Sequence, residues 1–404
     1  RIIPGISSAM AVPAYAGIPL THRDYASSVA FVTGHEREEK TESTIRWEHL
    51  GKGVDTLVFL MGMGNAGLIS QRLMENGRSP ETPVAVIQNG TTPSQRTLLT
   101  QLSKLEGEIR ERGFKPPGII VVGEVARLSE RLNWFEGLPL FSRKIVITRP
   151  KEQGEEMAEI LRRAGADVIQ FPTIEIAPPD SSEGLDMAIG AIETFDLVIF
   201  TSANGVRGFF QRLFQKGLDS RSLKGIRIVC IGPKTSSELF KYGIMADLIP
   251  GEFRAEGIVE ALSRYEIEGK RILIPRAQEA REVLAEALKD MGGEIYEEPA
   301  YKTTIPQGIN LNSTKAIFSK PPDLITFTSS STVRNLIEIL KTARIDLNPI
   351  TEKSIAACIG PITSQTASKA GFKHIIQAER YTAESLLKKI FDHFEGYLPQ
   401  SKRR

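Results

Sequence analysis

The stretch FTSANGVRGFF at residues 200–210 decides the fold, because it returns in closely similar form as FTSSSTVRNLI at residues 327–337. In both places an apolar run ends in a cluster of small polar residues, and bulky apolar residues then recur at helical spacing. A buried strand that leads through a polar turn into a helix is the basic step of an α/β protein. The sequence therefore predicts an α/β architecture that is written twice.

The repeat extends well beyond this phrase. Thr201 and Thr328 are 127 residues apart, and Cys230 and Cys358 are 128 apart. The same offset of 127 or 128 residues relates two further pairs, Lys144 with Arg271 and Phe253 with Tyr381. A unit of this length has the size of a typical domain, so duplication of one ancestral unit is the simplest explanation.

Short β-branched runs alternate with helical patterns inside each copy, as in KIVIT followed by EEMAEILRRAG. Glycines follow the last apolar residue of several helical patterns, where a left-handed cap is expected, at Gly165, Gly243 and Gly371. We therefore expect each copy to form a parallel, helix-covered sheet of the doubly wound kind.

Ligands of such sheets gather beyond the carboxyl ends of the strands, where helices begin and N–H groups are free. Several hydroxyl, amide and guanidinium groups occupy these positions in both copies, and plain helix capping is the alternative for each hydroxyl. The candidates for substrate binding are Thr201, Ser202, Asn204, Ser329, Ser330, Thr363, Ser364, Arg149 and Arg276. If the two rims face each other, they make a cleft suited to a large acidic ligand.

The two copies differ where Ile174 of the first aligns with Tyr301 of the second. Chemistry on a pseudo-symmetric scaffold has to break the symmetry, and a phenol beside a cleft can donate a proton to a leaving group. Tyr301 is therefore the candidate catalytic residue. The alternative is a tyrosine that only packs the interface between the lobes.

Composition excludes several classes of protein. A formal charge of +2 from 51 basic and 49 acidic residues argues against a general nucleic-acid surface. No apolar stretch reaches the ~18 residues of a membrane span and no secretory signal is evident, so the cytoplasm is the expected location. Cys230 and Cys358 are expected to be buried and reduced, and the five histidines lack zinc-ligand spacing, so no metal site is expected.

Residues 142–395 resemble uroporphyrinogen-III synthase, through KIVITRP, FTSANGV, CIGPKTSSEL, EEPAYKT, FTSSSTVRNL and ACIGPITSQTASKAG in this order. The resemblance implies two doubly wound lobes joined by a two-stranded linker: lobe one from about 142–175 plus 307–395, and lobe two from about 178–303. It implies that hydroxymethylbilane loses its hydroxyl group and closes through a spiro intermediate that inverts the last pyrrole, giving uroporphyrinogen III without a cofactor. It also implies that Tyr301 assists loss of the hydroxyl and that the hydroxyl-rich loops line the cleft.

Residues 1–137 lie outside the repeat and contain Gly62, Gly64 and Gly67 in a G-x-G-x-x-G pattern. A nicotinamide site would need an acidic residue at the end of the next strand, but that strand ends in Gln88 and Asn89. The glycine pattern is therefore only a weak match to the dinucleotide-binding fingerprint.

The same block resembles the C-terminal lobe of uroporphyrinogen-III C-methyltransferase, through PGISSAMAVPAYAGIPLTHRDYASSVAFVTGH, TLVFLMG, PVAVIQNGTTPSQR and IIVVGEVARLSERLNWF. By resemblance, S-adenosylmethionine contacts Ser7, Ser8, Met61 and Gly90. The N-terminal lobe of that family has no counterpart, so we expect a truncated methylase (1–137), joined to the synthase (138–404) near residues 134–144, with a possible homodimer through the methylase part.

The leading interpretation is a bifunctional protein of tetrapyrrole biosynthesis, in which the product of the synthase, uroporphyrinogen III, is the substrate of the methyltransferase that gives precorrin-2. A bilobed solute-binding module without chemistry is the first alternative, because two parallel-sheet lobes around a cleft also suit that task. A nicotinamide-dependent oxidoreductase is the second.

Overall fold

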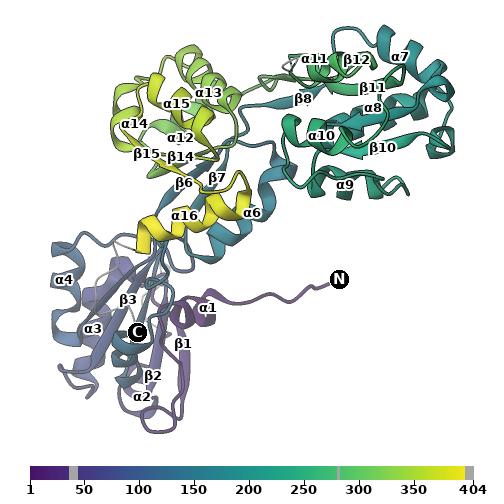
Figure 1. Cartoon of the computed structure of the whole chain (residues 1–404). Coiled ribbons are helices and arrows are strands. Elements are labelled where there is room, and N and C mark those ends of the chain that lie inside the picture. The colour runs from purple at the N-terminus through teal and green to yellow at the C-terminus, as the bar shows by residue number, and fades with distance from the viewer. Residues whose placement is uncertain (36–43, 280–282, 396–404) are drawn as a thin grey trace. The chain divides into compact units, whose positions relative to one another are not determined.

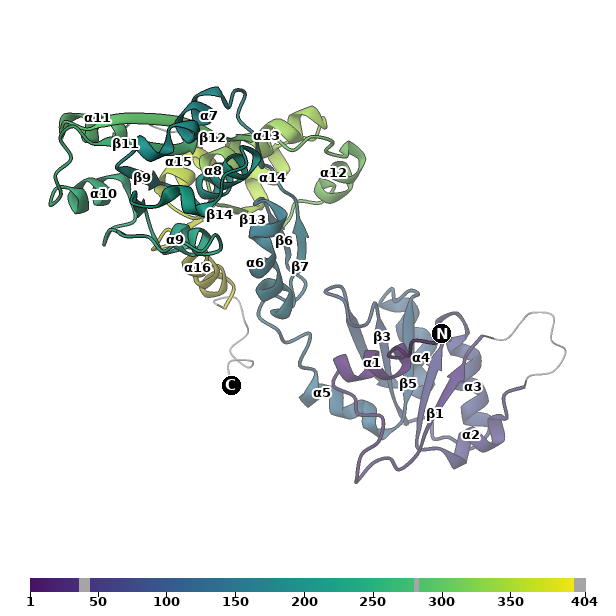
Figure 2. The ribbon, with the colours of Figure 1, turned by 90° about the vertical axis from the view of Figure 1, so that its right-hand side faces the viewer.

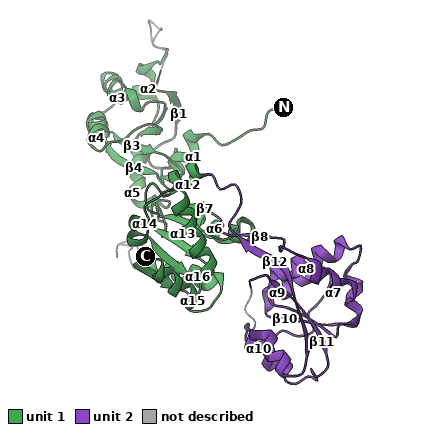
Figure 3. Ribbon diagram, turned by 90° about the horizontal axis from the view of Figure 1, so that it is seen from above, with its two compact units in different colours: residues 1–171, 311–404 green, residues 172–310 purple. Residues whose placement is uncertain are grey.

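The structure is a computed structural model that describes residues 1–35, 44–279 and 283–395. The chain divides into two compact units, residues 1–171 with 311–404 and residues 172–310 (Figure 3). The described part of the chain contains three five-stranded sheets. Two of them lie in the first unit and one lies in the second.

The N-terminal sheet has the order β1-β2-β5-β3-β4. Only β1 and β2 pair in parallel, and the three remaining pairings are antiparallel. Helices α3 and α4 pack on one face and α1 packs on the other (Figure 2). The elements are α1 (Ser8–Tyr15), β1 (Val29–Thr33), α2 (Trp47–Gly53), β2 (Thr56–Leu60), α3 (Ala66–Glu75), β3 (Pro83–Gln88), β4 (Arg96–Gln101), α4 (Leu105–Glu111), β5 (Gly118–Val122) and α5 (Ser129–Leu132).

The second sheet of the first unit is fully parallel, in the order β15-β14-β13-β6-β7 (Figure 1). Its elements are β6 (Lys144–Ile147), α6 (Lys151–Arg163), β7 (Asp167–Gln170), α12 (Leu311–Phe318), β13 (Leu324–Phe327), α13 (Ser330–Thr342), α14 (Asn348–Lys353), β14 (Ile355–Cys358), α15 (Pro361–Lys369), β15 (His374–Gln377) and α16 (Ala383–Glu395).

The second unit contains the sheet β10-β9-β11-β12-β8, which is parallel except for β8. Its elements are β8 (Glu175–Ala177), α7 (Glu183–Gly190), β9 (Leu197–Phe200), α8 (Ala203–Gln215), β10 (Arg227–Cys230), α9 (Pro233–Phe240), α10 (Ala255–Leu262), β11 (Arg271–Ala277), α11 (Val283–Asp290) and β12 (Glu294–Thr304). Alternate residues of β9 enter different cores: Val198 and Phe200 pack with α8, while Leu197 and Ile199 pack with α10 and α11. Helices thus cover both faces, as a doubly wound sheet requires.

The duplication is visible in the strand orders, but the copies do not form one sheet each. Strand β6 pairs with β13 of the other copy, and β9 pairs with β11 of the other copy. Each sheet therefore combines half of one copy with half of the other. The expectation of one parallel sheet per copy, which rested on the repeat alone, is wrong, whereas the lobe bounds implied by the family resemblance already combine parts of both copies. The matching strands still appear in the same order, β10-β9-β11-β12 and β14-β13-β6-β7.

Local features agree with the sequence patterns. Gly165, Gly243 and Gly371 all have positive φ, which confirms the predicted left-handed helix ends. Cys230 and Cys358 are buried free thiols, as predicted, and burial raises their pKa to about 12 and about 11. No helix in the described ranges is long and apolar enough to cross a membrane.

Helix α8 approaches the sheet closely at Gly208. A Cβ atom at this position would collide with the backbone carbonyl oxygen of Ala300 in β12. We expect Gly208→Ala to lower the free energy of unfolding of the second unit by about 1–3 kcal/mol. The new methyl group meets the backbone of β12, which cannot move aside as easily as the end of a flexible side chain. Hydrogen exchange of β12 peptides in the full-length chain, together with thermal unfolding, measures the change.

Gly190, the last residue of α7, is the matched control, because a Cβ there meets no atom within 4 Å. We expect Gly190→Ala to leave stability unchanged or to raise it by up to about 1 kcal/mol. Equal behaviour of the two variants would contradict the close approach of α8 to β12.

Candidate active site

The polar phrase after β9 forms the start of α8. Ser202 is the N-cap residue, and its Oγ accepts a hydrogen bond of 2.9 Å from the backbone N–H of Gly205. Capping was the alternative to ligand binding for this residue, and the structure shows that it occurs. An Oγ that accepts one hydrogen bond still has its own proton and a second lone pair for another partner.

That partner is Tyr301 in β12. Its Oη lies 3.0 Å from Oγ of Ser202, and the half-buried ring packs against the apolar core beneath α8. Burial raises the pKa of the Tyr301 phenol, and hydrogen bonds to Ser202 and Asn204 partly oppose this rise. The phenol is therefore protonated at neutral pH and has groups nearby that can stabilise a phenolate.

A β-bulge places the Tyr301 side chain. The register between β11 and β12 pairs Arg276 with Pro299 but Ala277 with Tyr301, so Ala300 is the extra residue. Side chains of a regular strand alternate between faces, yet the neighbours Ala300 and Tyr301 both contact the core beneath α8. The bulge has turned Tyr301 towards Ser202.

The equivalent loop after β13 carries several side chains with hydroxyl groups. Ser329 caps α13 in a capping box with Thr332. The Oγ atom of Ser330 accepts a 2.9 Å hydrogen bond from Thr366 of α15, which ties α13 to α15. Thr363 is buried, and the hydroxyl of Ser364 donates to the carbonyl oxygen of Gly360 at 3.1 Å. The structure thus brings Ser330 to α15 and engages Ser364 within its own helix.

The two predicted arginines have different surroundings. Arg149 lies two residues after the end of β6, its guanidinium lies 3.4 Å from Oε1 of Gln153, and burial lowers its pKa. Arg276 lies inside β11 and pairs with Glu297 of β12. Part of the Arg276 guanidinium is therefore engaged by a carboxylate of the protein itself.

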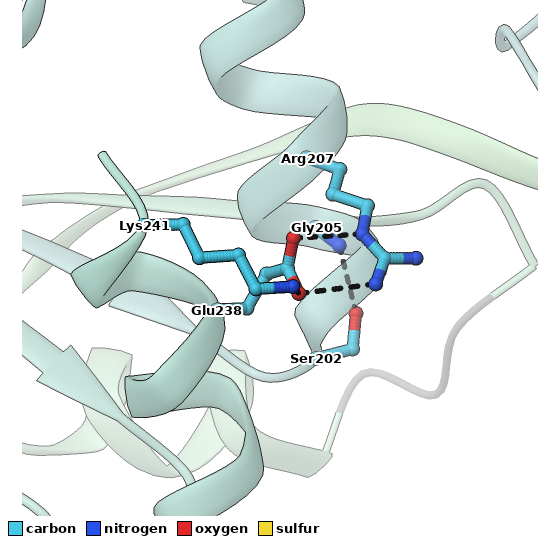
Figure 4. A network of polar contacts seen from close by, with 5 residues as sticks. All are labelled: Ser202, Gly205, Arg207, Glu238 and Lys241. Atoms are coloured by element: carbon cyan, nitrogen blue, oxygen red, sulfur yellow. Dashed lines mark hydrogen bonds and ion pairs between the residues drawn. The ribbon is translucent and has the colours of Figure 1, made fainter. Parts of the chain in front are cut away.

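An ion-pair cluster that sequence reasoning missed connects α8 to α9 (Figure 4). Glu238 is only 7% exposed and accepts two hydrogen bonds from Arg207, of 2.8 and 3.0 Å. Lys241 binds the same carboxylate at 2.9 Å, and these partners lower the pKa of Glu238. Helices α8 and α9 begin at the ends of β9 and β10. By joining the two helices, this cluster fixes the two strand-end loops relative to each other. An acidic residue on the apolar face of SSELF was its only sequence signal.

A separate cavity of about 1100 Å³ lies at the carboxyl ends of β2 and β3, and Ser142 and Asp167 of the synthase part line it together with the N-terminal block. Ser8, Met61 and Gly90 line it, whereas Ser7 is the N-cap of α1 and accepts from the N–H of Ala9 at 3.2 Å. Met61 and Asn89 have positive φ, an uncommon conformation for residues other than glycine that turns the backbone at both strand ends. A side chain at position 90 would collide with Val12, so Gly90 keeps this wall open.

The dinucleotide interpretation of Gly62, Gly64 and Gly67 is not supported. That fingerprint belongs to a βαβ unit whose two strands are parallel neighbours. Here β5 lies between β2 and β3, and it is antiparallel to both. Among residues 1–35, 44–279 and 283–395, no group of three His, Cys, Asp or Glu side chains is arranged to hold a metal ion.

Two family models match the chain. Residues 155–388 match "Uroporphyrinogen-III synthase HemD", and residues 1–106 match "Tetrapyrrole (Corrin/Porphyrin) Methylases". A relative from Ruminiclostridium josui, "Porphyrin biosynthesis protein HemD", is 35% identical over 97% of this chain and 76% of its own length.

Each part of the chain also has relatives of its own. A Synechococcus elongatus "Uroporphyrinogen-III synthase" is 38% identical over 62% of this chain and 94% of its own length. A Methanosarcina barkeri "S-adenosyl-L-methionine-dependent uroporphyrinogen III methyltransferase" is 48% identical over 33% of this chain, which covers 52% of that protein. The chain therefore belongs to the uroporphyrinogen-III synthase family and carries a tetrapyrrole-methylase segment before the synthase part.

Proposed function

We propose that this chain converts hydroxymethylbilane into uroporphyrinogen III at the strand-end loops that carry Tyr301 and Ser202. Family membership supports the reaction, and the observation that carries the site is the 3.0 Å contact between the two hydroxyl groups. A cytoplasmic location is also part of the proposal.

Proton transfer from Tyr301 is the first chemical step. The phenol gives its proton to the departing hydroxyl of the substrate, the carbon–oxygen bond breaks, and the group leaves as water. The electron pair of the adjacent pyrrole nitrogen supports the cation that remains, and the hydrogen bonds of Ser202 and Asn204 stabilise the phenolate. Solvent then returns a proton to Tyr301. The other predicted residues hold the carboxylates of the substrate through hydroxyl and N–H donors at the helix starts.

Much of the rate is expected to come from geometry. The substrate is a long, flexible and reactive chain, and holding its ends together converts an improbable encounter into an intramolecular step. Both predicted arginines already have partners within the protein: Arg276 pairs with Glu297, and Arg149 lies beside Gln153 and interacts with the charge of Glu384.

The methylase segment is proposed to hold part of a site for S-adenosylmethionine. Its cavity is large enough for such a ligand, and Ser8, Met61 and Gly90 line it, with Ser7 at the start of the adjacent helix. When bound, S-adenosylmethionine supplies an electrophilic methyl group. The segment spans about half the length of its methyltransferase relative, so methyl transfer is proposed to need the other half of the fold.

Incubation of the chain with enzymatically made hydroxymethylbilane tests the synthase directly. Closure without enzyme gives the type I ring, so an excess of the type III isomer after oxidation and separation is the expected result. Type I alone, at a rate equal to the reaction without enzyme, would refute the proposed activity and favour the solute-binding alternative.

The Tyr301→Phe variant tests the proton-donor role. We expect kcat to fall by about ten- to a hundredfold, because general acid catalysis is lost while positioning remains. Since burial raises the pKa of Tyr301, the protonated form persists as pH rises towards its ordinary value of about 10. The ratio of wild-type to variant rates should therefore stay constant from pH 7 to about pH 9.5 and fall only above it.

Tyr296→Phe is the matched control for this variant. Tyr296 lies on the same strand, but its Oη contacts Arg271 at 3.2 Å instead of Ser202. We expect normal turnover from Tyr296→Phe. Normal turnover from Tyr301→Phe as well would remove Tyr301 from the proposed mechanism.

For the methylase segment we expect weak binding of S-adenosylhomocysteine by calorimetry and no methylation of uroporphyrinogen III. Gly90→Val should abolish the residual binding, because the new side chain collides with Val12 at the cavity wall. Methyl transfer by residues 1–137 alone would contradict the need for a second half.

A further inference from the structure

Two large aromatic rings are exposed at equivalent places in the two copies. Phe253 lies in the loop before α10 and is 60% exposed, and Tyr381 lies in the loop before α16 and is 71% exposed. The two positions are 128 residues apart, the offset that also relates Cys230 to Cys358. An exposed aromatic ring contributes little to folding, so its occurrence in both copies calls for another explanation.

Each ring lies against a glycine of its own unit. Phe253 covers Gly232, the N-cap residue of α9, and Tyr381 covers Gly360, the N-cap residue of α15. Both glycines have φ of −172°, an extended conformation that any residue adopts, so the backbone does not require glycine.

The close approach of the rings explains these glycines. A Cβ atom at Gly232 would lie 3.2 Å from Cγ of Phe253, and one at Gly360 would lie 2.9 Å from Cδ1 of Tyr381. Each ring therefore lies close to bare backbone. The high exposure of both residues leaves much of each ring accessible.

The surroundings of the two rings suit a flat, anionic ligand. Gly232 and Gly360 follow β10 and β14, at the carboxyl ends of the parallel sheets, and helices of eight and nine residues begin beside them. Helix N-termini attract carboxylates, and exposed aromatic faces stack on planar rings. A pyrrole with acidic arms combines both properties in one molecule.

We propose that Phe253 and Tyr381 are each, within their own unit, a stacking surface for a pyrrole ring of a tetrapyrrole, and that the adjacent helix N-terminus receives a carboxylate arm of that ring. This inference rests on the proposed synthase function and adds two substrate-contacting residues to it. The structural alternative is a ring that only shields a helix end, in which case its loss would change stability and leave substrate binding intact.

Steady-state kinetics of Phe253→Leu and Tyr381→Leu test the inference. Each leucine variant should raise KM by about three- to tenfold with little change in kcat, because stacking binds the substrate and the transition state alike. Phe253→Tyr and Tyr381→Phe keep the stacking face and should behave like the wild type. Melting temperatures should stay within about 2 °C of the wild type, as is usual for exposed substitutions.

Phe240→Leu is the control for a general effect of losing an exposed ring. Phe240 is 65% exposed at the end of α9, and position 368 of the other copy is a serine, so the duplication did not retain a ring there. Its kinetics should be unchanged. Unchanged KM in both leucine variants, or an equal rise of KM in Phe240→Leu, would overturn the proposal.

An equilibrium titration separates this inference from the proposed function. Uroporphyrin III, the stable oxidised form of the product, is added to each variant and its binding is followed by absorbance. Weaker binding by the leucine variants supports stacking even if the wild type forms no type III isomer, which would refute only the synthase activity. Equal affinity in all variants would contradict stacking.

Discussion

The hydrogen bond between Tyr301 and Ser202 depends on one extra residue in a strand. Without the bulge at Ala300, the alternation of β12 would direct Tyr301 to the face that carries α10 and α11. With it, the phenol reaches the N-cap of α8 at the carboxyl end of the sheet. Packing against the core beneath α8 partly buries the ring, which keeps the phenol protonated, and the hydrogen bonds to Ser202 and Asn204 can stabilise a phenolate. Position and acid–base behaviour thus have one structural origin.

The duplicated scaffold uses different chemistry at matching positions. Helices α8 and α9 are joined by the carboxylate of Glu238 and the guanidinium of Arg207, whereas α13 and α15 are joined by the hydroxyl groups of Ser330 and Thr366. Both connections hold neighbouring strand-end loops together, but only the first is ionic. The copy that supplies Tyr301 and the loop that supplies Ser202 meet in one unit, because each sheet combines halves of both copies. The asymmetry that the proposed mechanism requires therefore arises inside a nearly symmetric frame.

Local features of this protein could be predicted from its sequence, and non-local ones could not. The repeat, the strand–helix alternation, the caps at Ser202 and Ser329 and the buried cysteines follow from short-range patterns, and the structure confirms them. The exchange of sheet halves depends on which strands pair over long distances, and no local pattern encodes that choice; only the family resemblance, with its lobe bounds of about 142–175 plus 307–395 and 178–303, implied it. Pro299 was a sequence signal for the bulge, since proline inside a strand indicates an edge or an irregularity. The ion pair of Glu238 had almost no sequence signal, because an acidic residue on a helix is usually solvated.

The protonation state of Tyr301 is the most direct test of this account. Tyrosine labelled with ¹³C at Cζ reports ionisation of each phenol by NMR, and comparison with Tyr301→Phe assigns the resonance. The account predicts that Tyr301 titrates above the ordinary value of about 10, and that Ser202→Ala, which removes a stabilising hydrogen bond, raises its pKa further. A Tyr301 resonance that titrates at or below the ordinary value, with no response to Ser202→Ala, would contradict it.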